Sequence, residues 1–140
     1  MNEIVNTQNQ PGEGKPSKIR ILVADDEKFA RKIIRQLLVE TKYEISFVES
    51  GEEAINTLQN DVVFDVVILD LLMAGIDGYE TLICLKQEKL TSHLPVIIIT
   101  ALNDDEEKEK AISLGAAVYL IKPIQAQQLI NAIDICIQAE

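Results

Sequence analysis

The feature that most restricts the fold of this chain is the strict alternation of short apolar runs with stretches of helical periodicity. The apolar runs are predicted to be strands over residues 19–24, 43–48, 66–69, 96–100 and 116–121. Helices are predicted after them, over residues 27–40, from 50 onward, and over 78–89, 104–114 and 125–138. The central strands are apolar on both faces and rich in β-branched residues, which is typical of a parallel sheet covered on both sides. Five successive βα units predict an α/β domain with a doubly wound parallel sheet and right-handed crossovers.

Local signals mark several helix ends. Ser50 with Glu53, and Asn103 with Glu106, have the spacing of a capping box at a helix N-terminus. Gly115 follows the charged fourth helix and is predicted to end it, because glycine readily adopts the left-handed backbone conformation found there. These signals agree with the helix boundaries that the apolar periodicity indicates.

Charge and composition restrict the class of protein. The chain of 140 residues has 13 basic and 23 acidic residues, so its formal net charge is −10. A domain this acidic is not expected to bind nucleic acid directly, and favours cationic ligands or basic partners. No apolar run is long enough to cross a bilayer, and no signal peptide is recognisable. We therefore expect a cytoplasmic protein without a membrane partner.

The length predicts one domain with a short appendage. Residues 1–17 have few apolar side chains among many Asn, Gln, Gly and Pro residues, and are predicted to be a disordered lead-in. The ordered domain is predicted to span residues 18–140. Cys84 and Cys136 are the only cysteines, and both fall within apolar helical patterns far from any CxxC spacing. We interpret both as reduced core residues of a cytosolic protein.

Polar side chains stand at the C-terminal ends of four predicted strands. The acidic pair Asp25-Asp26 follows the first strand, Asp70 the third, Thr100 ends the fourth, and Lys122-Pro123 follows the fifth. Each of them alone could be an ordinary strand-end or loop residue. Because strand ends on one edge of a parallel sheet converge, we expect three carboxylates, a hydroxyl and an ammonium group to share one crevice.

This combination of side chains indicates phosphoryl chemistry. Three carboxylates repel one another unless a hard cation joins them, and an oxygen-only set with room for water suits Mg²⁺. A carboxylate beside such an ion, a lysine and a hydroxyl is equipped to attack phosphorus. Asp70 is the predicted nucleophile, Lys122 offsets charge on the phosphoryl oxygens, and Thr100 donates a hydrogen bond to one of them. The product would be an aspartyl phosphate.

Together these residues resemble the receiver domains of two-component response regulators, best known from the single-domain chemotaxis type. The resemblance covers residues 18–140 and rests on the acidic pair, Asp70, the motif M-x-G-x-D-G at residues 73–78, Thr100-Ala101 and Lys122-Pro123. It implies a flavodoxin-like fold with strand order 2-1-3-4-5. It also implies a phosphoacceptor that assists its own phosphorylation and slow dephosphorylation, rather than an enzyme with an external substrate.

The resemblance also implies roles for individual residues. The metal would be bound by Asp26, Asp70 and the backbone carbonyl of Leu72, with Asp25 acting mostly through water. The backbone N–H of Ala101, with Thr100 and Lys122, would bind the phosphoryl oxygens. Thr100 and Tyr119 match the family's switch residues, and the peptide bond before Pro123 is expected to be cis.

Partners follow from the same resemblance. A sensor histidine kinase or a phosphotransfer protein would supply the phosphoryl group. The surface formed by the fourth helix, fifth strand and fifth helix commonly pairs receivers, so a homodimer is expected there. The apolar residues of the last predicted helix cover an arc of roughly 220°, which is more than one face of a sheet requires. Part of that helix is therefore expected to be exposed.

Some positions depart from the family pattern. Ala74 stands where the family usually has proline, so the loop after Asp70 is expected to be less rigid. Leu72 and Leu102 are apolar at positions that influence how water reaches the phosphoryl group. An alternative function is a degenerate receiver that acts as an unphosphorylated interaction module, but retention of all five site residues argues against it. A phosphatase of the haloacid dehalogenase type would need an aspartate in place of Leu72.

Overall fold

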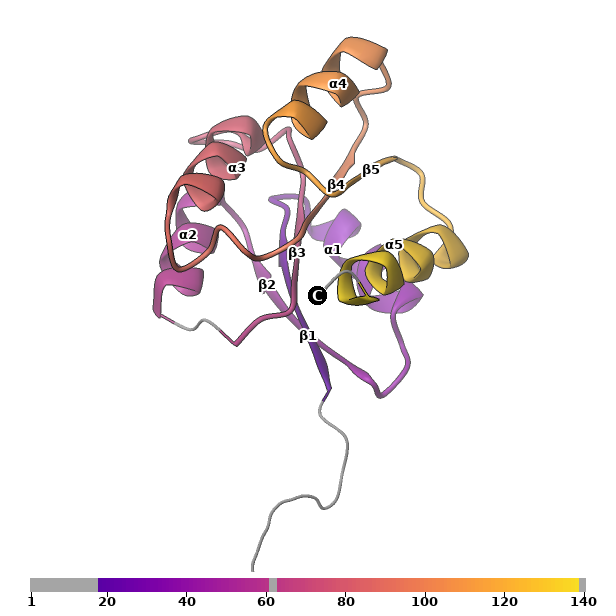
Figure 1. The fold of residues 1–140 in the computed structure, drawn as a ribbon. Coiled ribbons are helices and arrows are strands. Elements are labelled where there is room, and N and C mark those ends of the chain that lie inside the picture. Colours follow the sequence, from indigo (N-terminus) through magenta and orange to yellow (C-terminus); the bar gives the residue numbers. More distant parts are fainter. Residues whose placement is uncertain (1–17, 61–62, 139–140) are drawn as a thin grey trace, which may run out of the picture.

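Strands and helices alternate along the described part of the chain, which is residues 18–60 and 63–138 of the computed structural model (Figure 1). The strands are β1 (Ile19–Ala24), β2 (Tyr43–Val48), β3 (Val66–Leu69), β4 (Val96–Thr100) and β5 (Val118–Ile121). The helices are α1 (Lys28–Leu37), α2 (Gly51–Asn60), α3 (Gly78–Gln87), α4 (Asp105–Ser113) and α5 (Ala126–Gln138). The predicted lead-in at residues 1–17 lies outside the described residues.

The described strands form one parallel sheet in the order β2-β1-β3-β4-β5. This confirms the predicted flavodoxin-like fold. After β1 the chain moves outward to β2, and it then returns to place β3 on the other side of β1. The strand order therefore reverses between β1 and β3. In sheets of this type a crevice forms at that point, outside the carboxyl ends of the strands.

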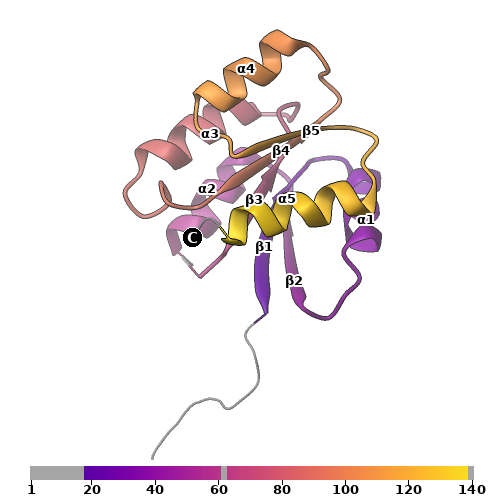
Figure 2. The ribbon, with the colours of Figure 1, turned by 45° about the vertical axis from the view of Figure 1, so that its right-hand side comes forward.

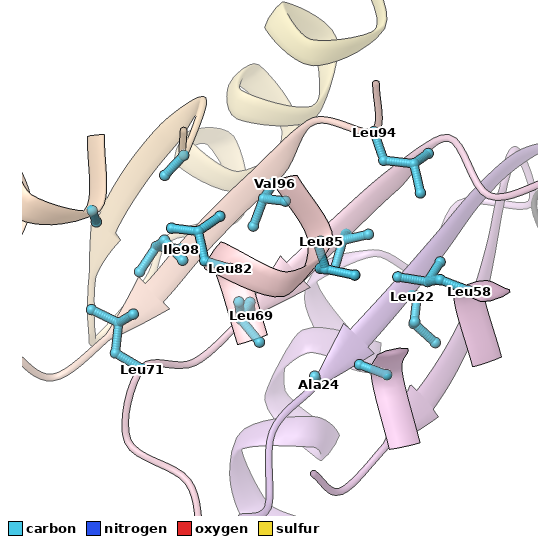
Figure 3. Packing of buried hydrophobic residues seen from close by; sticks show 14 of the residues in the cluster. Leu22, Ala24, Leu58, Leu69, Leu71, Leu82, Leu85, Leu94, Val96 and Ile98 are labelled. Carbon is cyan, nitrogen blue, oxygen red and sulfur yellow. The ribbon is translucent and has the colours of Figure 1, made fainter. Parts of the chain in front are cut away.

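Both faces of the sheet are covered by helices, because successive strand residues point to opposite faces. α2, α3 and α4 cover one face, and α1 and α5 cover the other (Figures 1 and 2). The core under α2, α3 and α4 includes Leu22, Leu69, Ile98, Leu58 and Leu82 (Figure 3). The core under α1 and α5 includes Ile21, Ile68, Ile99, Ile34 and Leu129. The central strands lie between two buried layers, which hold their C-terminal ends in place.

The predicted cap of α4 is wrong. Asp104 is the N-cap of this helix, and its side chain accepts no capping hydrogen bond. A capping box formed by Asn103 and Glu106 requires the helix to begin at residue 104, but α4 begins at Asp105. Three acidic residues occupy its first turn, where they interact favourably with the positive end of the helix dipole. Gly115 follows the helix with a positive φ of 111°, which agrees with its predicted role at the helix end.

The predicted capping box at α2 is half formed. The Ser50 hydroxyl accepts a hydrogen bond from the Glu53 N–H at 3.1 Å. The Glu53 carboxylate accepts one from the Glu49 N–H at 2.7 Å, rather than from the N–H of Ser50. A complete capping box occurs instead at α3, between Asp77 and Glu80.

The interpretation of both cysteines as core residues is correct for Cys136 and wrong for Cys84. Cys136 is a buried residue of α5, whereas Cys84 of α3 is exposed. α3 buries Leu82 and Leu85, and Cys84 points away from that side. The apolar pattern of this helix is broader than its buried face. Among the described helices, none is both long and apolar enough to span a membrane.

Candidate functional site

The strand register brings the predicted site residues to one edge of the sheet. Ala24 of β1 pairs with Leu69 of β3, so Asp25 and Asp70 follow at the ends of neighbouring strands. The Asp70 N–H donates to the Ala24 carbonyl at 3.1 Å, which continues the ladder past the last strand residues. The two carboxylates therefore emerge at the point where the strand order reverses.

The fifth strand delivers a cation to the same edge. Thr100 of β4 pairs with Ile121 of β5, and the N–H of the next residue, Lys122, donates to the Thr100 carbonyl at 2.8 Å. The Lys122–Pro123 peptide bond is cis. The Lys122 Nζ lies 2.8 Å from Asp70 Oδ2 and 3.1 Å from Asp25 Oδ2. One ammonium group thus joins the ends of three strands.

Both oxygens of each carboxylate accept a hydrogen bond. Asp25 Oδ1 accepts a hydrogen bond from the Glu27 N–H at 2.9 Å, and Asp70 Oδ1 accepts one from the Leu72 N–H at 2.9 Å. The remaining oxygen of each faces Lys122. Asp25 is 2% exposed and Asp70 is 5% exposed. These side chains therefore have fixed positions before any ligand binds.

Burial and charge shift the pKa values of this cluster. Burial raises the pKa of Asp25, and the charge of Asp70 acts in the same direction, against the Glu27 N–H and Lys122. Burial alone would lower the pKa of Lys122, but its hydrogen bonds to the two carboxylates and their charges raise it overall. Lys122 therefore stays protonated at neutral pH. A single ammonium faces two carboxylates, so the cluster favours an additional cation.

Asp26 faces a different direction from its neighbour. Its Oδ2 accepts a hydrogen bond from the Ala74 N–H at 2.9 Å, in the loop that connects β3 to α3. Asp26 is exposed, whereas Asp25 is buried. Within residues 18–60 and 63–138, no three acidic, histidine or cysteine side chains are grouped closely enough to hold a metal ion. The structure brings Asp25 and Asp70 together at Lys122, whereas Asp26 bonds to the loop between β3 and α3.

The loop between β3 and α3 is anchored at several places. Glu52 of α2 accepts a hydrogen bond from the Ile76 N–H at 3.3 Å, and Gly75 has a φ of +81°. The capping box then starts α3 at Gly78. A Cβ atom on Gly78 would lie 2.4 Å from both the Asp70 carbonyl oxygen and the Leu71 Cα. The helix therefore begins in direct contact with the backbone of the acidic site.

The predicted switch residues lie around the start of the loop after β4. Thr100 is fully buried at the end of that strand, and its hydroxyl accepts a long hydrogen bond of 3.4 Å from the Leu102 N–H. Ala101 is exposed between them. The Tyr119 side chain is buried, and its hydroxyl donates to the Leu102 carbonyl at 2.9 Å. Thr100 and Tyr119 thus contact the same residue of this loop.

Two contacts near the site could not be predicted from the sequence. Arg31, which the helical periodicity places on the solvent face of α1, donates from Nη1 to the Asp25 carbonyl at 2.8 Å. The Tyr79 hydroxyl donates to the carboxylate and, at 3.2 Å, to the carbonyl of Glu107, linking α3 to α4. These contacts join residues from different elements, and no local pattern indicates them.

Comparison with known proteins agrees with this geometry. A family model described as the response regulator receiver domain matches residues 21–134. The chain is 35% identical over 128 residues to the 3',5'-cyclic-nucleotide phosphodiesterase regA of Dictyostelium discoideum, a match that covers 89% of this chain and 16% of that protein. It is 31% identical over 114 residues to the transcriptional regulatory protein ResD of Bacillus subtilis, covering 81% of this chain and 46% of ResD.

Solved structures give the same result. The receiver domain of Francisella response regulator 1452 matches with a TM-score of 0.79 and 29% identity, over 87% of this chain and 98% of that one. The receiver domain of a signal transduction histidine kinase from Syntrophus aciditrophicus matches with a TM-score of 0.77 and 28% identity, over 86% of this chain and 90% of that one. The chain spans less than half the length of the two curated relatives. From its fold, the residues at its strand ends and the family match over residues 21–134, this chain belongs to the response regulator receiver domain family.

Proposed function

We propose that this receiver domain accepts a phosphoryl group on Asp70 from a histidine of a sensor kinase or phosphotransfer protein. The observation that carries the proposal is the position of the Lys122 Nζ, 2.8 Å from Asp70 Oδ2 and 3.1 Å from Asp25 Oδ2. In the reaction, an Asp70 oxygen attacks phosphorus, and the bond from phosphorus to the donor's imidazole nitrogen breaks. Lys122 then binds the phosphoryl oxygens, whose charge replaces that of the free carboxylate.

The residues of the site fit Mg²⁺. Asp25, Asp26, Asp70 and the Leu72 carbonyl offer only oxygen ligands, which a hard cation prefers. Two of these carboxylates are buried and share a single ammonium group, so the cluster carries a net negative charge. When bound, Mg²⁺ would offset charge on the phosphoryl oxygens. Asp26, whose Oδ2 accepts the Ala74 N–H, is not grouped with the other acids in the described part of the chain and would have to turn to join them.

Thr100 and Ala101 would complete the phosphoryl site. The Thr100 hydroxyl and the Ala101 N–H stand at the end of β4 and would bind phosphoryl oxygens. The contact of Thr100 and Tyr119 with Leu102 supports a role in the switch. A turn of the Thr100 hydroxyl toward a phosphoryl group would release the Leu102 N–H, and so change the loop that Tyr119 also holds.

A groove beside the site supports docking of the phosphoryl donor. It has a volume of about 360 Å³ and lies between α1 and residues 122–124. Phe29, Ile33 and Leu37 of α1 line it together with Lys122, and the Phe29 side chain is 71% exposed. An apolar helix of the donor seated in this groove would have its histidine close to Asp70.

Incubation with Mg²⁺ and acetyl phosphate tests the proposed acceptor. We expect the intact mass of the wild-type protein to increase by that of one phosphoryl group, and this gain to disappear in Asp70→Asn. Lys86→Gln, on α3, serves as a matched control and should still be phosphorylated. Absence of the mass gain in the folded wild-type protein would support the unphosphorylated interaction module instead.

We also propose that phosphorylation strengthens a homodimer through α4, β5 and α5. β5 lies between the two helices in both views (Figures 1 and 2). Each of the three elements has one exposed isoleucine, Ile112, Ile121 and Ile135, with 43%, 41% and 58% exposure. On α5 the apolar arc does extend beyond the core, since Leu129 and Ile133 are buried and Ile135 is exposed.

Sedimentation velocity with beryllofluoride tests this dimer. We expect the phosphoryl mimic to shift the wild-type protein from monomer to dimer, and Ile135→Glu to abolish the shift because a buried, unpaired carboxylate is costly. Leu90→Glu, an equally exposed apolar site on another surface, should dimerise normally. A strict monomer in both states would contradict the proposed interface.

We further propose that the domain acts in the cytoplasm without direct contact with nucleic acid or membrane. Neither Cys84 nor Cys136 forms a disulfide, as expected in a reducing compartment. The net charge of −10 opposes binding to phosphate backbones and to anionic lipid surfaces.

A further inference from the structure

The carboxylate of Asp26 is held by the loop after β3. Its Oδ2 accepts the Ala74 N–H at 2.9 Å, across 48 residues of sequence. The same loop is held independently from α2, through the bond between Glu52 and the Ile76 N–H. The loop therefore keeps an anchor when Asp26 turns away, so the Ala74 bond can open without releasing the whole segment.

The Ala74 N–H and a cation compete for Asp26. Hydrogen bonds to an ionised group are shorter and about twice as strong as neutral ones, and 2.9 Å is a normal length for such a bond. Asp26 takes no part in the contacts of Lys122, which are with Asp25 and Asp70. In the described part of the chain the three acids are not grouped to hold a metal ion. Asp26 must therefore turn before all three can act on one ion.

Only a residue with a backbone N–H can hold Asp26 in this way. Proline has no N–H. The sequence predicts only a less rigid loop at Ala74. In the structure, its N–H also forms a hydrogen bond that a proline in its place could not form.

We propose that Ala74 is a positioning residue that weakens Mg²⁺ binding, because its N–H holds the Asp26 carboxylate away from the ion. This inference rests on the proposed function, since it requires Mg²⁺ to bind at the acidic site. It adds to that function a dependence on Mg²⁺ concentration. The domain would need a higher Mg²⁺ concentration for phosphorylation than the same chain with proline at position 74.

Calorimetric titration with MgCl₂ at constant ionic strength tests the inference. We expect Ala74→Pro to bind Mg²⁺ about three- to tenfold more tightly than the wild-type protein, as loss of one competing hydrogen bond would produce. Ala74→Ser keeps the N–H and should bind like the wild-type protein. In an Asp26→Asn background, where Mg²⁺ binds more weakly, the proline substitution should no longer tighten binding, because the carboxylate for which the N–H and the ion compete is gone.

The outcomes separate this inference from the proposed function. If neither the wild-type protein nor Ala74→Pro binds Mg²⁺, the proposed magnesium site and the role of Ala74 are both overturned. A wild-type protein that binds Mg²⁺, with an Ala74→Pro variant of equal or lower affinity, overturns the role of Ala74 alone. If the proline variant does not fold, the Ala74 amide of the ¹⁵N-labelled wild-type protein decides. We expect saturating Mg²⁺ to shift its proton resonance upfield and to speed its exchange with water, and an unchanged amide would overturn the inference.

Discussion

Lys122→Met is expected to lower the free energy of unfolding by about 3 kcal/mol in EDTA, a typical cost of removing one partner of a buried ion pair. For a domain of this size that corresponds to a fall of roughly 10 °C in melting temperature. The reason is that Asp25 and Asp70, which are 2% and 5% exposed, would face each other without a cation. Thermal melts followed by circular dichroism measure the change. Addition of MgCl₂ should reduce the deficit, because a bound cation replaces part of the lost charge.

Two further variants separate the charge effect from packing. Lys108→Met removes an exposed lysine of α4 and should leave the melting temperature within about 1 °C. Adding Asp70→Asn to Lys122→Met should recover part of the lost stability, because only one buried carboxylate then remains uncompensated. If Lys122→Met melts within about 2 °C of the wild-type protein, or the double variant melts lower still, the electrostatic role of Lys122 is contradicted.

Gly78→Ala is expected to destabilise the domain by about 2 kcal/mol, the usual cost of overpacking a close contact. The added Cβ would lie 2.4 Å from the Asp70 carbonyl oxygen and the Leu71 Cα. These are backbone atoms, so α3 or the end of β3 must move. Alanine favours a helix over glycine by at most about 1 kcal/mol, which is too little to offset the contact. Urea unfolding measures the change.

The matched control exchanges the same two residue types at the start of another helix. Ala126 is the first residue of α5, and Ala126→Gly should cost less than about 1 kcal/mol through helix propensity alone. Gly78→Ser should be at least as destabilising as Gly78→Ala, since it adds the same Cβ. A Gly78→Ala variant as stable as the wild-type protein would mean that the backbone contact relaxes freely.

The fold and the central contacts of the site could be predicted from short-range patterns. Strands such as Val66–Leu69 are apolar on both faces, and only a parallel sheet between two helical layers buries them. Parallel strands carry the residues after their C-terminal ends to one edge of the sheet, which brings Asp25, Asp70 and Lys122 together. The strand order itself came from resemblance to the family, because periodicity does not distinguish neighbours in a sheet.

The features that the sequence could not indicate depend on the orientation of single side chains. Asp25 and Asp26 are adjacent and chemically identical, yet one is buried against Lys122 and the other bonds to Ala74. Adjacent residues at a strand end point in different directions, and the partner of each depends on loops distant in sequence. Cys84 illustrates the same limit on a helix, where an apolar side chain fits the periodic pattern but faces solvent.

The ion pair between Asp25 and Lys122 joins residues 97 positions apart in the sequence, from the first strand of the sheet to the residue after the last. During synthesis, a chain that has emerged as far as β4 already contains the proposed acceptor Asp70 but not the strand that carries its cation. Contacts between residues so far apart carry a large loop-closure cost, which slows their formation. A chain in which β5 has not joined the sheet would lack Lys122 beside Asp70, so the proposed phosphoryl site would be complete only after the last strand is in place.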